Sequence, residues 1–177
     1  GTYPEIWFFY PSRGSEEANR YVIYNWAENW WSWGALSRSA MIQAGSNPVP
    51  YMGDSSGHLF KHETGFTDAG ASRVGTIWAE TGALQIGSGD QFWEIKQALI
   101  ANGHGATSIS MTFFSQFTPE GPEIVFGPYM PRQDGYTDTR VTARSARIRF
   151  ASTVDNDWDF GLVRLDAEYA ALPGWAR

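Results

Sequence analysis

Histidines and one acidic run are the residues of this sequence best suited to hold a metal ion. His58 and His62 lie four positions apart, a spacing that places two imidazoles on one face of a helix and suits zinc. Their neighbours show the pattern of a strand, along which four residues span roughly 13 Å, so we expect the two rings not to share a metal. His104 stands in the run Asn-Gly-His-Gly, which is typical of a turn.

The acidic run 155–159 begins like a calcium-binding loop, with aspartates at its first, third and fifth positions. The glycine that such a loop needs at position six comes one place late, at Gly161, and position twelve is Asp166 instead of glutamate. The same residue types are strong turn formers. We therefore interpret the run as the tip of a hairpin and predict that the protein has no metal site.

Other arrangements that could support catalysis lack the context that the chemistry needs. Acidic pairs such as Glu63 with Asp68, or Glu120 with Glu123, show no defined separation across a cleft. The run 87–89, Gly-Ser-Gly, is not followed by the start of a helix that would bind phosphate. No serine stands in a nucleophile elbow. We therefore expect neither enzymatic activity nor a bound cofactor.

The composition indicates a folded protein with more aromatic side chains than one core uses. Of the 177 residues, 42% are hydrophobic, 16% are aromatic and nine are tryptophan, so some rings should be exposed or buried against other subunits. The absence of cysteine excludes disulfides and thiolate metal sites. A net charge of −6 argues against non-specific nucleic-acid binding. No apolar run is long enough for a membrane-spanning helix, so we expect no membrane anchor.

Residues 1–70 show short apolar runs separated by turn formers, a pattern typical of β-sandwiches and β-propellers. The runs 20–26 and 30–33 flank Ala-Glu-Asn and predict a hairpin. Because a second, similar unit follows, we predict propeller-like blades that are too few to close a propeller. The hairpin tryptophans belong to a blade core or to a contact surface. The candidates for a subunit or partner contact are Trp30, Trp31 and Trp33.

A small, polar run at 68–72 predicts the boundary to a second domain. Residues 73–170 predict an antiparallel β-sandwich, so the fold class is all-β, and residues 171–177 predict a loose tail. The clearest strand is 106–117, in which Ile109, Met111 and Phe113 alternate with polar residues. The run 91–100 fits both a helix and a strand, and its all-β surroundings favour a strand.

The stretch 137–166 predicts the central support of the second domain. Its apolar alternation slips by one position near Arg144 and again near Gly161, which we interpret as two bulges in one long hairpin. The expected buried face consists of Ile148, Phe150, Trp158 and Phe160. Arg147 and Arg149 lie on the opposite face and are further candidates for a contact with solvent or a partner subunit.

Two runs in this stretch resemble a known family. Residues 140–150, RVTARSARIRF, then a short acidic loop and residues 158–166, WDFGLVRLD, resemble the end of the tail nozzle (tail-hub, or packaged DNA stabilisation) proteins of short-tailed bacteriophages. The strand units of residues 1–70 resemble the closing blades of the β-propeller in the same family. The resemblance includes no catalytic motif.

The resemblance implies a structural protein of the virion, in the phage neck or tail. Such a protein forms a homo-oligomeric ring below the portal and adaptor, continues the DNA conduit, helps retain packaged DNA without reading its sequence, and carries other tail proteins. Because the sequence starts at Gly1 close to a strand-like run, we expect it to be the C-terminal part of a longer polypeptide. The alternative is a carbohydrate-binding β-sandwich module or host-receptor adhesin with tryptophan rings stacked on sugars, and a tail glycan hydrolase is third.

Overall fold

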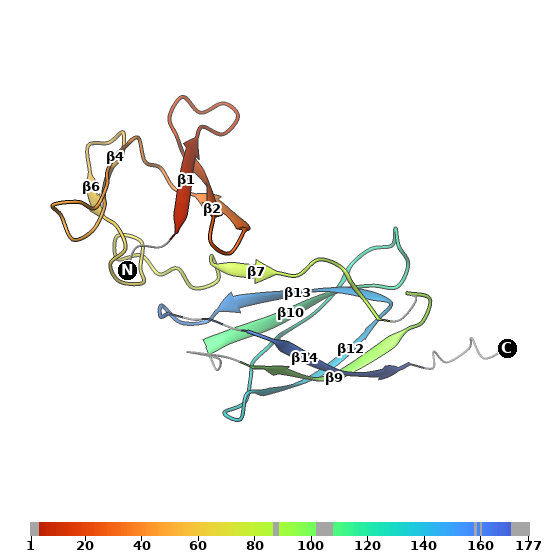
Figure 1. The fold of residues 1–177 in the computed structure, drawn as a ribbon. Helices are drawn as coiled ribbons and strands as arrows, with labels where there is room; N and C mark the ends of the chain where they lie inside the picture. The colour runs from red at the N-terminus through yellow and green to blue at the C-terminus, as the bar shows by residue number, and fades with distance from the viewer. Residues whose placement is uncertain (1–3, 87–88, 102–107, 158, 160, 171–177) are drawn as a thin grey trace. The chain divides into compact units, whose positions relative to one another are not determined.

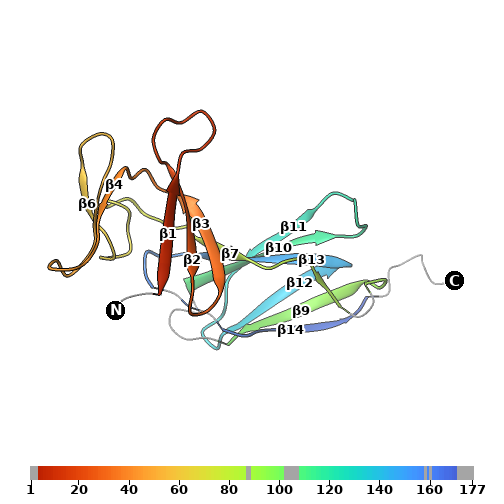
Figure 2. The same cartoon turned by 45° about the horizontal axis from the view of Figure 1, so that its top comes forward.

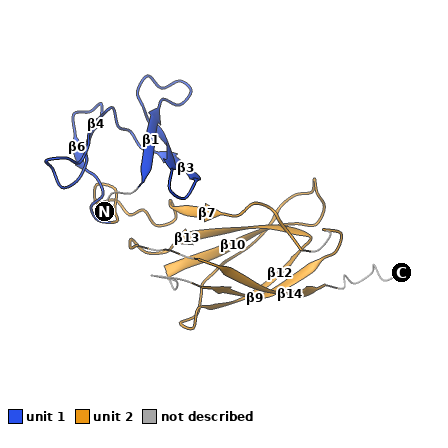
Figure 3. Cartoon of the chain, viewed as in Figure 1, with its two compact units in different colours: residues 1–65 blue, residues 66–177 orange. Residues whose placement is uncertain are grey.

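The computed structural model describes residues 4–86, 89–101, 108–157, 159 and 161–170, and these residues form an all-β protein. They build fourteen β-strands, and the paired strands run antiparallel. The chain divides into two compact units, residues 1–65 and residues 66–177 (Figure 3). The boundary expected at 68–72 lies shortly after this division.

The first unit contains two three-stranded sheets (Figure 1 and Figure 2). One sheet has the order β1-β2-β3 and the other has the order β4-β5-β6. The strands of this unit are β1 (Glu5–Tyr10), β2 (Arg20–Asn25), β3 (Trp30–Ala35), β4 (Ala40–Ile42), β5 (Tyr51–Gly53) and β6 (Leu59–Lys61).

The hairpin expected between the runs 20–26 and 30–33 is confirmed, and two asparagines explain its turn. Oδ1 of Asn25 accepts hydrogen bonds from the backbone N–H groups of Ala27 and Glu28, at 3.1 and 3.0 Å. Asn29 has a φ of 57°, a left-handed conformation that asparagine adopts more readily than most residues. The turn therefore sets the register in which β2 pairs with β3.

Few apolar side chains of the first unit are buried. Among its described residues, Ile23 and Met52 are the only aliphatic, methionine or aromatic side chains in the buried set. The guanidinium of Arg38 is also buried, 3.7 Å from the ring centre of Phe60, and its Nε donates to Nε2 of His62 at 3.0 Å. A unit of this size with so little buried apolar surface lacks the hydrophobic stabilisation of an ordinary domain.

The second unit contains two sheets. One has the order β11-β10-β13-β7, with β8 also paired to β13, and the other has the order β12-β9-β14. The strands are β7 (Trp78–Glu80), β8 (Leu84–Gln85), β9 (Trp93–Ile100), β10 (Ile109–Gln116), β11 (Ile124–Tyr129), β12 (Tyr136–Ala143), β13 (Ser145–Ser152) and β14 (Val163–Tyr169). The strands predicted at 91–100 and 106–117 are therefore confirmed as β9 and β10.

The two sheets of the second unit share one core, and Figure 2 shows β9, β12 and β14 lying side by side as one of the two sheets. The core residues are Ile95, Ala98, Ile100, Ile109, Met111, Phe113, Val141, Ile148 and Phe150. The predicted alternation of β10 is confirmed, because Ile109, Met111 and Phe113 are fully buried, whereas the adjacent Phe114 is not. Ile148 and Phe150, at 1% and 2% exposed, confirm half of the buried face predicted for 137–166. Trp158 and Phe160 lie outside the described residues.

The single hairpin predicted over 137–166 is wrong. Strand β12 pairs with β9, whereas β13 pairs with β10, so the chain passes from one sheet to the other at Arg144. Strand β14 pairs with β9 and not with β13. The slip in alternation that we interpreted as a bulge marks this passage. Two sheets that face one core present opposite faces to it, so the buried positions must change phase where the chain crosses.

Contacts of Arg144 hold this crossing in place. Its backbone N–H donates to the carbonyl of Gln116 at 3.1 Å, and its Nε donates to the carbonyl of Gly89 at 2.7 Å. Ala143 and Ala146, on either side, are both buried. Their small side chains allow the backbone to turn between the sheets without displacing the larger core residues.

Two buried threonines on β12 provide a test of the core. Oγ1 of Thr139 donates to the carbonyl of Ile95 at 2.8 Å, whereas Oγ1 of Thr137 has no hydrogen-bond partner within the described part of the chain. We expect Thr137→Val to raise the free energy of unfolding by about 1 kcal/mol, because it removes an unpaired buried hydroxyl. Thr139→Val, which loses a hydrogen bond, should lower it by about 1 kcal/mol. Guanidinium unfolding followed by tryptophan fluorescence checks both values, and a Thr137→Val protein that unfolds earlier than the wild type would contradict the first.

Candidate subunit or partner interface

One face of the β1-β2-β3 sheet is apolar and exposed. The register pairs Phe8 with Val22 and Val22 with Trp33, so these three side chains lie on the same face. Phe8 is 51% exposed and Trp33 is 69% exposed. We call the whole set the aromatic face, and its members are Ile6, Phe8, Tyr10, Val22, Tyr24, Trp31 and Trp33.

Rings on the aromatic face pack against one another. Trp31 stacks on Tyr24 with ring centres 4.5 Å apart and on Phe8 with ring centres 6.5 Å apart. The planes are inclined by only 26° and 27°, so each ring covers part of its neighbour's π-face. The result is a continuous apolar surface whose single charged neighbour, among the described strand residues, is Arg20, opposite Tyr10.

Trp30 lies on the opposite face of the same sheet from Trp31 and Trp33, the other two predicted contact tryptophans. Trp30 pairs with Asn25 across the hairpin, and its Nε1 donates to a carboxylate oxygen of Glu28 at 3.0 Å. Trp7 and Tyr21 stack on this face with ring centres 5.0 Å apart. The structure therefore brings Trp31 and Trp33 together and places Trp30 elsewhere.

The sequence interpretation missed the part of the aromatic face that β1 contributes. Ile6, Phe8 and Tyr10 alternate along this strand with the less exposed Trp7 and Phe9. The signal is a period of two, but every residue from 6 to 10 is apolar or aromatic, so the alternation of faces is invisible in hydrophobicity. Only the pairing with β2 shows which three side chains join Trp31 and Trp33.

Arg147 and Arg149 project from β13 on the side opposite Ile148 and Phe150, as predicted, and they form a network with two glutamates. Nε of Arg149 lies 2.8 Å from a carboxylate oxygen of Glu80, and Arg147 pairs with the other oxygen of that carboxylate. Nη2 of Arg147 also lies 2.6 Å from Glu123. The hydrogen bond to Glu123 and the nearby carboxylate charges raise the pKa of Arg147 above its usual value.

The guanidinium groups of the same two arginines also lie close to aromatic rings. The guanidinium of Arg149 lies 4.5 Å from the ring centre of Trp78 and 4.8 Å from that of Phe114. Arg147 lies 5.1 Å from the Phe114 ring. Both arginine side chains are about one-third exposed, at 32% and 37%. The positive charge of the two arginines is therefore compensated by glutamates of the same unit. The surface that they form with the aromatic rings is close to neutral.

Glu80 and Glu123 allow a matched test of this network. The Glu80 side chain is 13% exposed and serves two arginines, whereas that of Glu123 is 35% exposed and serves one. We expect Glu80→Gln to lower the free energy of unfolding by about 1–2 kcal/mol, and Glu123→Gln by at most about 0.5 kcal/mol, because the more exposed pair is screened by water. Equal losses in urea unfolding of the two variants would show that burial of Glu80 is unimportant.

The candidate metal ligands bind other protein groups. Nδ1 of His58 lies 3.0 Å from Asp54, and the backbone N–H of His58 is the main cause of the lowered pKa of that carboxyl. His62 contacts Arg38 instead. Oδ1 of Asp155 accepts the backbone N–H of Arg73 at 2.7 Å. Within the described ranges, no three His, Asp or Glu side chains are grouped as a metal site would require. His104 lies outside these ranges.

A chelator should leave the protein unchanged. EDTA in excess is expected to leave the melting temperature where it is, because the candidate ligands are engaged in local hydrogen bonds of the chain. Thermal melting with and without EDTA, followed by re-addition of calcium or zinc, checks this expectation. A melting temperature that falls by several degrees and recovers with calcium would instead support the calcium-loop interpretation of 155–159.

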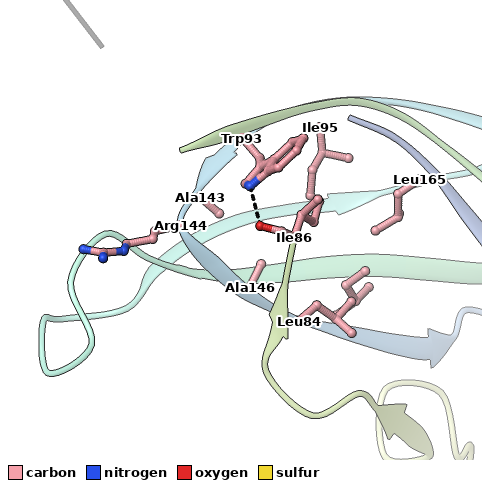
Figure 4. A pocket seen from close by; sticks show the side chains of 9 residues that line it. Leu84, Ile86, Trp93, Ile95, Ala143, Arg144, Ala146 and Leu165 are labelled. Carbon is pink, nitrogen blue, oxygen red and sulfur yellow. Dashed lines mark hydrogen bonds between the residues drawn. The ribbon is translucent and has the colours of Figure 1, made fainter. Parts of the chain in front are cut away.

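The second unit has a small apolar pocket at the edge of its core (Figure 4). Trp93 closes one side, and its Nε1 donates to the carbonyl of Ile86 at 3.1 Å. Leu84, Ala146 and Leu165 line other parts of it. A volume of about 20 Å³ admits at most one water molecule, and an apolar lining offers that water no partners. The pocket is thus a packing defect and not a ligand site.

No family model matches this sequence, and no curated protein matches it. The part of the chain that the structure describes contains no helix with the length and hydropathy of a membrane span.

Proposed function

We propose that this chain is a structural protein of a phage virion, in the neck or tail, and corresponds to the C-terminal region of a tail nozzle protein. It forms a ring of identical copies that continues the DNA conduit, helps to retain packaged DNA and carries other tail components. Its main support is the aromatic face: large exposed side chains lie on a unit that has almost no buried core of its own. Such a surface is typical of a protein that is stable only in an assembly.

The fold is compatible with the domain types that this proposal requires. We interpret the two three-stranded sheets of residues 1–65 as parts of propeller blades, and the two sheets around the shared core as a β-sandwich. The sheets of the first unit do not close on themselves within the described residues, so on this interpretation their open edges are covered by strands of another polypeptide or of a neighbouring copy.

Charge supports the conduit part of the proposal. The chain carries a net charge of −6, and its β13 arginines are compensated by Glu80 and Glu123. A wall of this kind repels phosphate, so DNA passes without binding to it.

The alternative is a carbohydrate-binding module, and the exposed ring of Trp33 favours it. Sugars bind to the open face of a tryptophan, and Trp33 is 69% exposed. The neighbouring Trp31, however, has its ring stacked on Tyr24 at 4.5 Å, which removes part of the platform that an extended sugar chain needs. The aromatic face is therefore better suited to a protein surface than to a glycan.

Particle mass and position in the virion test the proposal. We expect the purified full chain to assemble into closed oligomers in mass photometry, and density or antibody labelling to place it in the neck or tail of the phage particle. Absence of the chain from purified virions would reject the proposal. Binding on a glycan array that is lost in Trp33→Ala, by a protein that stays monomeric, would establish the alternative.

A further inference from the structure

The edges of the β1-β2-β3 sheet differ from the sheet edges of the second unit. Strands β1 and β3 each contain six residues, and between residues 6 and 10 and between 30 and 35 they carry no charged side chain and no proline. Within the described residues each of them pairs only with β2. Long, uncharged edge strands readily pair with another chain, and most proteins avoid them.

Edges in the second unit show the usual protection. Strand β11 contains Pro128, which lacks a backbone donor. Strand β12 carries Asp138 and Arg140, and β14 carries Arg164 and Asp166, so charges alternate along both. Strands β7 and β8 have only three and two residues. Proline, alternating charges and short length therefore protect these edges against pairing with another chain, whereas β1 and β3 have none of these features.

We propose that the free edge of β3 pairs with the free edge of β1 in a second copy of this chain, so that the sheet continues from copy to copy. The inference rests on the proposed ring and names the surface that forms it. Strands β1 and β3 run in the same direction, because each is antiparallel to β2. A rotation that carries one copy onto the next therefore brings β3 and β1 together as a parallel pair.

Three features favour a second copy as the occupant. The two open edges belong to one sheet, so a single contact between identical copies covers both, whereas foreign partners would have to supply two different strands. The strands have equal length. Neither brings a charge to the shared segment, so no like charges meet across it. The contact also extends the aromatic face, placing Trp33 of one copy beside Phe8 of the next.

The contact between β3 of one copy and β1 of the next also predicts a closed ring. A contact between different surfaces of identical subunits leaves one open β1 and one open β3 at the ends of any chain of copies. Only a closed ring satisfies every edge. Pairing of β1 with β1 across a twofold axis would instead stop at a dimer and leave both β3 edges open.

Two edge variants of the full chain test this contact. Phe8→Lys blocks β1 and Trp33→Lys blocks β3, both at positions more than half exposed. Each variant alone is expected to lose the oligomer and run as a monomer in mass photometry. An equimolar mixture should form a dimer with twice the monomer mass and nothing larger, because only one open β1 and one open β3 remain per pair. Val125→Lys, on the exposed part of β11, is the control and should keep the wild-type mass.

Cross-linking covers the case in which a lysine variant fails to fold. The chain has no cysteine, so Phe8→Cys and Trp33→Cys each introduce a single thiol. A short bismaleimide should link the mixture of these two variants into dimers and should link neither variant alone. Folded protein that gives no dimer in the mixture, or Lys variants that keep the full oligomer, would overturn the edge contact while leaving a ring in the virion possible through another surface. A wild-type chain that stays monomeric at all concentrations would also overturn it, and detection of the chain in virions tests the function separately.

Discussion

Phe150→Ala is expected to lower the free energy of unfolding of the second unit by about 3–5 kcal/mol, the usual cost of removing a buried aromatic ring. Phe150 is 2% exposed and lies opposite Met111 in the pairing of β13 with β10. It belongs to the single core that both sheets share. A loss of this size is a large part of the stability of an ordinary domain, so the second unit should unfold well below its normal melting temperature.

Arg147→Ala, three positions earlier on the same strand, is the matched control. Its side chain is 32% exposed, and Glu80 keeps its second partner, Arg149, when Arg147 is removed. We expect a loss of at most about 1 kcal/mol, because partly exposed ion pairs contribute little. Differential scanning calorimetry of both variants, with particle mass measured in parallel, checks the contrast. If Arg147→Ala unfolds as early as Phe150→Ala, the assignment of buried and outer faces on β13 is incorrect.

Residues 1–70, expressed alone, are expected to show no cooperative unfolding transition. Ordering one residue costs about 1–2 kcal/mol of conformational free energy, and burial of apolar surface must offset it. Among the described residues of this segment, Ile23 and Met52 are the only large hydrophobic side chains that are buried. The open edges of β1 and β3 add a tendency to aggregate.

Residues 66–177 are the control for this fragment, because the shared core lies within them. We expect this second fragment to melt cooperatively. Circular dichroism and calorimetry of the two fragments, with light scattering to detect aggregation, give the comparison. A monomeric 1–70 fragment with a sharp melting transition would show that the first unit is stable without the cover that we assign to its aromatic face and edges.

Local pattern in the sequence determined which segments became strands and, in β10 and β13, which side chains face inward. In β10, Ile109, Met111 and Phe113 alternate with polar residues, and they are buried. The turn between β2 and β3 follows from Asn25 and Asn29, whose side-chain hydrogen bonds and left-handed φ are local properties. Interactions between residues close in sequence are enough to specify such features.

Apart from the β2–β3 hairpin, which strands pair in the stretches discussed was decided only by the tertiary structure. The stretch 137–166 has the alternation of a bulged hairpin, yet β12 and β14 both pair with β9, and β13 pairs with β10. A one-residue shift in alternation is produced equally by a bulge and by passage between two facing sheets. The two cases differ in contacts between distant residues, such as that of Arg144 with Gly89, which a linear pattern does not contain.

In the candidate interface, too, the sequence determined one part of the result and the tertiary structure determined the other. The surplus of tryptophan predicted that some rings lie on a contact surface, but Trp30 and Trp31, adjacent in sequence, face opposite sides of the sheet. Register with β2 is what places Phe8 beside Trp31, and pairing with β7 is what brings Glu80 to Arg147 and Arg149. The sequence determined the residue types available for contact, whereas the face on which they gather depends on hydrogen bonds between strands far apart in the chain.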